Sequence, residues 1–324
     1  MQSKKVIGMV GVLSNPAKKI TSHNGGWTMV IKSIAEKDFD CEVKIMTDKD
    51  DWDQCEMLIV NEGVNYKMGQ YNLFGGVTRQ ILDKLEKLNS FKGKVINYGE
   101  FIDYEEFCEK RKIDFNFTQG IHYKFTFDRN KLVYGDSHAI SVYKPGFGID
   151  RNDGKTLFGM LSEGLDNNIR TGLDELIFYA GNIDVRHHIL RNYKGNNMED
   201  YLVKTYFEKL QDQLRELNCK KITLVELLPI EDVSRKIPGT GMYMKTPFCG
   251  TWKERSNIVK IFNNLLKDLC KQEDYDLISW PDENSDEYGM LKFEVMEARQ
   301  SVHLAPHSYY FADEFVYKKQ LNLF

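Results

Sequence analysis

The chain has 324 residues, of which 42% are hydrophobic and 28% are charged, as in ordinary globular proteins. Its formal net charge of −4 gives no overall positive field for a nucleic acid backbone, so only a local groove could bind one. No apolar stretch approaches the roughly 20 residues of a membrane span, and the N-terminal apolar run is too short for a signal peptide. Six scattered cysteines without a C-x-x-C pair are typical of reduced thiols, so we expect a cytoplasmic protein.

The first half of the chain alternates predicted strands with predicted helices. Apolar runs typical of buried parallel strands occupy residues 6–13, 42–46, 57–60 and 94–98, and helical spacing covers residues 27–36 and 77–88. Strands alternating with helices predict βαβ units and a doubly wound sheet. We expect this Rossmann-like domain to cover residues 1–125.

The second half repeats this alternation. Strands are predicted at residues 132–134, 175–180, 222–228 and 277–280, and helices at residues 156–165, 201–217, 258–269 and 309–319. A length of 324 residues suits two domains. The sequence therefore predicts an α/β protein of two three-layer domains with mainly parallel sheets, the second covering residues 126–324.

Three polar turns in the second half follow predicted buried strands or lie near the C-terminus. They are Gly135-Asp136-Ser137-His138, the segment from Gly181 to His188, and Gln300-Ser301-Val302-His303-Leu304. Parallel strands end at one edge of a sheet, so these turns can converge. A serine is a weak nucleophile unless a base takes its proton.

These turns contain candidates for the nucleophile, the base and the oxyanion donors of acyl chemistry. We predict that Ser137 is the nucleophile and that His303 is the base. Asn182 and backbone N–H groups near Ser137 and Gly154 would stabilise the oxyanion.

The ordered turns resemble the sequence blocks of the SGNH or GDSL hydrolases over residues 130–315. Gly135-Asp136-Ser137 is similar to the first block of that family, and its extension through His138 and Ala139 resembles sugar O-acyltransferases and polysaccharide-locus members. Gly181-Asn182-Ile183-Asp184 resembles the Asn-containing block, and its continuation through Arg186 and His188 is similar to bacterial members. The resemblance implies an SGNH-like C-terminal domain with serine-dependent chemistry.

One position departs from the family pattern. The residue three before the histidine is an aspartate in the family and is Gln300 here, and a neutral amide cannot stabilise an imidazolium by charge. Either a Ser–His dyad suffices, or Glu297, Asp184 or Asp136 substitutes, or the site no longer hydrolyses esters. Asp136, predicted here as a further catalytic residue, could equally cap the following turn.

Several polar side chains near these turns are candidates for substrate contacts. Arg186 and His188 suit an anionic substrate unless they belong to a surface loop. The loop before Thr156 ends like a P-loop but has Ile149 where the first glycine is required, which excludes a Walker site. Backbone amides and basic side chains of that loop can still hold an anion. The substrate-binding candidates are His138, Asp184, Arg186, His188, Arg151, Lys155, Arg235 and Gln300.

No metal site and no cofactor are predicted. The histidines have neither H-x-x-x-H nor H-E-x-x-H spacing, and there is no G-x-G-x-x-G for a dinucleotide. In the first half, glycines after the first strand could let the backbone approach a phosphate. The ligand candidates of that half are His23, Asn24, Gly25, Gly26, Asn61 and Asn65.

A short part of the first half resembles phage DNA β-glucosyltransferases. The likeness lies in Leu58-Ile59-Val60-Asn61 through Asn65 and in Asn72-Leu73-Phe74-Gly75-Gly76. It implies a glycosyltransferase-like N-terminal domain and a phage-type enzyme connected with sugars or modified bases. A scaffold domain is the alternative.

The sequence as a whole predicts a serine-dependent esterase or O-acyltransferase acting on a sugar-like or nucleoside-like small molecule. Two alternatives stay open. One is a glycosyltransferase-like enzyme of nucleic acid modification, and the other is a catalytically silent protein that binds a nucleotide or a host component.

Overall fold

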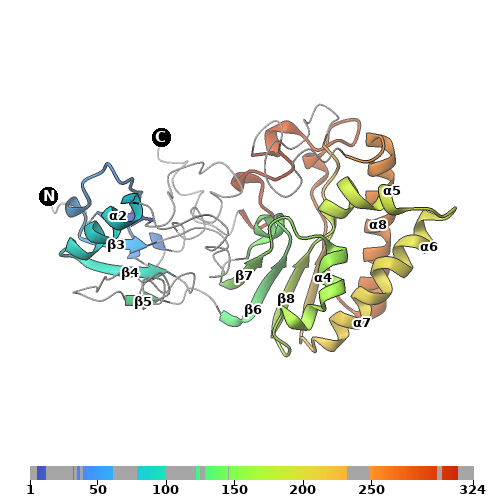
Figure 1. The fold of residues 1–324 in the computed structure, drawn as a ribbon, viewed down its shortest axis with the longest axis horizontal. Coiled ribbons are helices and arrows are strands. Elements are labelled where there is room, and N and C mark those ends of the chain that lie inside the picture. Colours follow the sequence, from blue (N-terminus) through green and yellow to red (C-terminus); the bar gives the residue numbers. More distant parts are fainter. Residues whose placement is uncertain are drawn as a thin grey trace. The chain divides into compact units, whose positions relative to one another are not determined.

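The protein is described from a computed structural model (Figure 1). It describes residues 6–11, 32, 35–36, 39–60, 79–98, 122–124, 128–144, 146–231, 248–297 and 301–312. The chain divides into two compact units, one of which is Asp128–Phe311, while the residues before it belong to the other. Within the described part, no helix has the length and apolar character that a membrane crossing requires.

The first unit contains a parallel sheet of five strands in the order β2-β1-β3-β4-β5. The central strands β1 and β3 are almost wholly buried, which explains their continuous apolar sequences. The bounds are β1 (Ile7–Val10), β2 (Val43–Ile45), β3 (Met57–Val60), β4 (Lys94–Tyr98) and β5 (His122–Lys124), with the helices η1 (Trp52–Gln54) and α2 (Arg79–Ser90).

The second unit contains a parallel sheet in the order β10-β9-β8-β6-β7. Strand β6 lies between β7 and β8, and its last residue, Gly135, pairs with Arg151 of β7 and Tyr179 of β8. The polar turns that follow β6, β7 and β8 therefore leave the sheet side by side. The bounds are β6 (Asp128–Gly135), β7 (Phe147–Arg151), β8 (Glu175–Tyr179), β9 (Ile222–Val225) and β10 (Asp276–Ile278).

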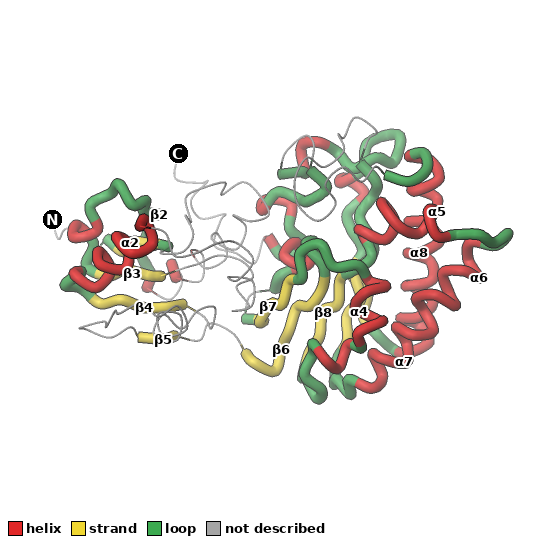
Figure 2. The backbone as a smooth tube through the Cα atoms, in the orientation of Figure 1, coloured by secondary structure: helices red, strands yellow, loops and turns green. Residues whose placement is uncertain are grey.

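Helices lie beside this second sheet (Figure 2). Helix α8 begins with a capping box between Thr251 and Glu254, and the π-helical turn η6 joins α6 to α7. The predicted apolar stripe of that helical run is buried at Leu202, Tyr206, Leu210, Leu214 and Leu217. The bounds are α4 (Leu157–Glu163), α5 (Ile189–Asn192), α6 (Met198–Leu202), α7 (Glu208–Glu216) and α8 (Trp252–Glu273).

Single helical turns complete the second unit. They are η3 (Ala139–Val142), η4 (Leu165–Asn167), η5 (Asp184–His188), η6 (Val203–Phe207), η7 (Asp282–Asn284), η8 (Phe293–Val295) and η9 (Pro306–Ser308).

The predicted α/β class with mainly parallel sheets is confirmed. Two strands, β5 and β7, were not predicted: both lie at sheet edges, and neither has a continuous apolar run. The turn predicted through His188 is instead helical from Asp184, as η5 continues into α5. The closing helix predicted at 309–319 is not α-helical over its described residues 309–312, and the rest of it lies outside the described part.

Candidate active site

Strand β6 is held against β8 up to the residue before Ser137. A Cβ atom added to Gly135 would lie 1.8 Å from the carbonyl oxygen of Tyr179, so this position requires glycine. The N–H of Asp136 donates to that same oxygen at 3.0 Å. The nucleophile candidate therefore leaves a fixed strand end.

Asp136 organises the turn that carries Ser137. Its side chain is fully buried, and its Oδ1 accepts hydrogen bonds from the backbone N–H of His138 at 2.8 Å and from Nδ1 of His138 at 3.0 Å. Its carbonyl accepts from the N–H of Ala139. Asp136 thus caps its own turn and pairs with His138 rather than with His303.

Ser137 and His303 lie within hydrogen-bonding distance of each other. Nε2 of His303 is 2.8 Å from Oγ of Ser137, and the serine is 8% exposed. The segment that carries His303 is fixed by antiparallel backbone contacts, because the N–H of Glu297 donates to the carbonyl of His303 and the N–H of Ala305 donates to that of Val295.

Glu297 lies behind the His303 ring. Its Oε1 is 3.4 Å from Nδ1 of His303, and it accepts a hydrogen bond of 2.5 Å from the hydroxyl of Ser301. Ser301 Oγ also lies 3.4 Å from Nδ1 and accepts from the N–H of His303. Of the three acids left open by the sequence, the structure brings Glu297 to the imidazole.

Ser301 was missed as a site residue, although it stands inside the predicted block. Its hydroxyl accepts from the N–H two residues later, which is the ordinary ST-turn pattern of serine. A serine two residues before the candidate base was the available signal.

His138 connects the nucleophile turn to the segment of His303. Its Nε2 lies 3.2 Å from the carbonyl oxygen of Val302, and its ring centroid is 4.6 Å from that of His303. Its exposed fraction is only 2%. The prediction that His138 contacts substrate is therefore not supported, because both ring nitrogens face oxygens of the protein.

Asn182 follows β8 through Gly181, whose φ of +117° favours glycine. The amide is buried, with its Oδ1 3.5 Å from Nη1 of Arg186. Its Nδ2 is also buried, and the amide interacts with the hydroxyl group of Tyr179. The turn next to that of Ser137 therefore carries a buried amide donor.

The surroundings of Arg186 do not support the prediction that it contacts an anionic substrate. The side chain is 2% exposed, and its Nε and Nη2 both donate to Oε2 of Glu231, at 3.0 and 2.8 Å. Its Nη1 donates to the carbonyl of Asn182 at 3.0 Å. Because a buried carboxylate and a carbonyl occupy its donors, Arg186 fixes the Asn182 turn instead. Glu231 was missed; it is an acid directly after the apolar run that follows β9.

The loop after β7 pairs its cations internally. Arg151 is buried and forms an ion pair with Asp153 at 2.8 Å, and Lys155 pairs with Glu163. Their predicted role as anion contacts is therefore not supported. Gly154 lies in this loop with a φ of +76°, three residues after the partner of Gly135 in the sheet.

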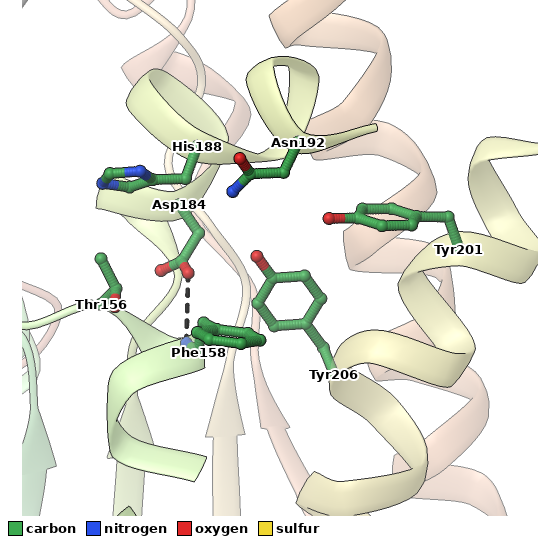
Figure 3. Close-up of a pocket in the computed structure, with 7 residues that line it drawn as sticks. All are labelled: Thr156, Phe158, Asp184, His188, Asn192, Tyr201 and Tyr206. Carbon is green, nitrogen blue, oxygen red and sulfur yellow. Dashed lines mark hydrogen bonds between the residues drawn. The ribbon is translucent and has the colours of Figure 1, made fainter. Parts of the chain in front are cut away.

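Asp184 and His188 lie together in a cavity of ≈ 420 Å³ (Figure 3). Asp184 accepts hydrogen bonds from the N–H groups of Leu157 at 2.7 Å and Phe158 at 3.1 Å, at the start of α4. Burial raises the pKa of Asp184 to about 7, against the opposing effect of these N–H donors. Burial, and then the charge of Arg191, lowers the pKa of His188.

The other predicted site residues lie outside the described part of the chain. They are Gln300, Arg235, His23, Asn24, Gly25, Gly26, Asn61 and Asn65. Among the described residues, no group of three or more His, Cys, Asp and Glu side chains is arranged to hold a metal ion.

No family model matches the chain, and a search of curated proteins found no match. Solved structures give distant likenesses at TM-scores of 0.40, 0.40 and 0.33. The first is a protein from Streptococcus pneumonia described as a platelet activating factor, 17% identical, over 59% of this chain and 84% of that chain. The second is a GDSL-like lipase from Bacteroides thetaiotaomicron, which is 13% identical over 60% of this chain and 89% of that chain. The third is an extracellular lipase from Streptomyces rimosus, which is 11% identical over 60% of this chain and 99% of that chain.

Likenesses this distant carry no argument about activity, so the function has to be argued from the site. The resemblance of the first half to phage DNA β-glucosyltransferases finds no support in these comparisons.

Proposed function

We propose that the unit Asp128–Phe311 is a serine-dependent esterase or O-acyltransferase with Ser137 as nucleophile and His303 as base. The 2.8 Å contact between Oγ of Ser137 and Nε2 of His303 carries this proposal. A serine becomes an effective nucleophile when a base within about 2.6–3.2 Å takes its proton.

The first half of the reaction forms an acyl-enzyme. Oγ of Ser137 attacks the ester carbonyl while Nε2 of His303 takes the hydroxyl proton. The carbonyl oxygen becomes an oxyanion, for which the buried Nδ2 of Asn182 and the N–H of Ser137 are the proposed donors. Collapse expels the alcohol, which receives the proton from His303.

The second half reverses these roles with a different nucleophile. His303 takes a proton from water in hydrolysis, or from an acceptor hydroxyl in acyl transfer, and Ser137 leaves with that proton. Glu297 faces Nδ1 of His303 and stabilises the imidazolium that forms in each half.

The proposed substrate is a small molecule bearing an ester on a sugar-like or nucleoside-like group. The support is the resemblance of Gly135 to Ala139 to the first block of sugar O-acyltransferases. The weaker likeness of the first half to phage enzymes adds the proposal of a phage-type protein.

A fluorophosphonate probe tests the nucleophile on the full chain. Wild type should be labelled, and Ser137→Ala should not. Ser162→Ala is the matched control, because Ser162 is an exposed serine whose hydroxyl donates to the carbonyl of Phe158 in α4. Absence of labelling in wild type, or equal labelling of Ser137→Ala, would sink the proposal in favour of the binding-only alternative.

Product analysis then separates the two reactions. Acetylated sugars and nucleosides would be incubated with wild type, with and without an acceptor sugar, and followed by mass spectrometry. A transferase should move the acetyl group to the acceptor, whereas an esterase should release acetate at a rate that the acceptor does not change.

A further inference from the structure

The cavity around Asp184 is separate from the Ser137–His303 pair, neither of which lines it. It lies among η5, α4, α5 and the run from α6 to η6 (Figure 3). The seven residues that line it include no lysine or arginine. They are Thr156, Phe158, Asp184, His188, Asn192, Tyr201 and Tyr206.

A buried carboxyl group forms one wall of this cavity. Asp184 is 0% exposed, and its oxygens accept two backbone N–H bonds from α4. Among the residues that the structure describes, no lysine or arginine forms an ion pair with it. Burying an ionised carboxylate without a cation is costly, so the cavity offers a position that a ligand cation would stabilise.

Aromatic rings supply the other walls. Tyr201 and Tyr206 come from the α6–η6 run, and the ring of Phe158 packs edge-on against that of Tyr206, with centroids 6.3 Å apart. Phe158 is 48% exposed, which is unusual for a large apolar side chain at a cavity. Faces of aromatic rings attract cations, and several rings around one carboxylate are a recurrent arrangement for organic ammonium groups.

We propose that this cavity is a binding site for a small organic cation, with its ammonium group near Asp184 and the rings of Phe158 and Tyr201. The cavity volume of ≈ 420 Å³ accommodates a ligand of that class. The polar groups of Thr156 and Asn192 are available to a hydroxyl on the same ligand.

The charges around the site agree with a cationic ligand. Of the seven lining residues, His188 is the one that can carry a positive charge. Burial lowers its pKa, so it does not repel a cation at neutral pH. Burial raises the pKa of both tyrosines, which stay neutral. Asp136 adds a negative field at Asp184. Two cations oppose such a ligand: Arg191, beside His188, and Lys209, whose Nζ lies 5.8 Å from the centroid of the Phe158 ring.

Proton release gives a signature of this site. At pH 6 Asp184 is mostly protonated, because its pKa is about 7, and a bound cation favours the ionised form. Binding should therefore release up to about one proton at pH 6 and much less at pH 8.5. Calorimetric titration in two buffers of different ionisation enthalpy measures this number.

Choline and 3,3-dimethyl-1-butanol are the matched probes, since they share a shape and differ in charge. Titration of the full chain at pH 8 should show saturable choline binding and at least roughly tenfold weaker binding of the alcohol. Asp184→Asn should weaken choline binding at least about tenfold, and Phe158→Leu by roughly three- to tenfold. Tyr288→Leu, which replaces a 70% exposed ring outside the cavity, should bind choline like wild type.

Three results would overturn the proposal. They are no saturable binding of choline, equal affinity for choline and the neutral alcohol, and choline binding that Phe158→Leu leaves unchanged. Phe158→Leu decides the matter if Asp184→Asn does not fold, because the Phe158 ring is largely exposed. None of these outcomes depends on labelling of Ser137.

Discussion

Nε2 of His303 lies 2.8 Å from Oγ of Ser137, although 166 positions separate the two residues in the chain. The serine leaves the end of β6, whereas the histidine belongs to an irregular segment held by antiparallel backbone contacts to residues 295–297. The contact therefore depends on two separately fixed pieces of backbone.

Replacing Glu297 with glutamine should slow the ester reaction by between about 10- and 10⁴-fold, the upper value being the loss known for a triad acid. The carboxylate faces Nδ1 of His303 and stabilises the imidazolium, so its loss should also move the acidic limb of the pH–rate profile to lower pH. Steady-state kinetics across pH measures both effects. Glu294→Gln, at an exposed acid three residues away, should leave the profile unchanged. Equal profiles for both variants would remove Glu297 from the mechanism.

Gly135→Ala should destabilise the second unit by several kcal/mol, on the order of the larger core changes. The new Cβ would lie 1.8 Å from the carbonyl oxygen of Tyr179, and backbone must move to relieve that contact. Gly148→Ala is the control, because its Cβ would approach no atom closer than 3.5 Å in the neighbouring strand. Urea denaturation gives the free energy of unfolding. Equal stability of the two variants would contradict the tight β6–β8 approach.

Arg186→Met should lower the free energy of unfolding by about 3–5 kcal/mol, because it removes the buried guanidinium whose Nε and Nη2 donate to Oε2 of Glu231. The double replacement of Arg186 and Glu231 by methionine should recover part of that loss. Arg215→Met removes the ion pair of Arg215 with Glu273, in which the arginine side chain is about half exposed. This change should lower the free energy of unfolding by at most about 1 kcal/mol. Denaturant midpoints test all three, and a buried pair no more costly than the surface pair would refute the argument.

Asp184 should make the stability of the protein depend on pH. Its pKa is about 7 in the folded protein and ordinarily 3.8, so the folded protein binds this proton more tightly. The free energy of unfolding should therefore fall as pH rises from about 4 to about 7, by at most about 4 kcal/mol, and then level off. Subtracting the pH dependence of Asp184→Asn from that of wild type isolates this contribution. A difference that instead grows with rising pH would show the opposite sign of shift.

The sequence predicted the parts of the fold that depend on local periodicity. Continuous apolar runs identified β1, β3, β8 and β9, because strands buried on both faces carry no alternation. The edge strand β7, Phe147–Arg151, was not predicted, because it contains a glycine and charged residues instead of a continuous apolar run.

The site was predictable where chemistry follows strand ends and not where it depends on three-dimensional pairing. Ser137 and His303 were found as polar residues in turns, and the sheet edge brought them together. The pairing of Arg186 could not be predicted, because nothing in its turn indicates that its partner in the core is Glu231, 45 residues later. Glu297 could be named only as one of three acids, because the sequence gives no sign of the antiparallel backbone contact that brings it to His303.

The order of the site residues along the chain has a consequence for synthesis. His303 comes later in the chain than Ser137, Asn182 and the Arg186–Glu231 pair. His138 also contacts a later residue, because its Nε2 lies next to the carbonyl oxygen of Val302. During synthesis, β6, β8, β9 and Ser137 are thus available before the ribosome has added His303. Such an intermediate would hold the nucleophile as an ordinary, unreactive hydroxyl, and reactivity would begin only when the last irregular segment docks.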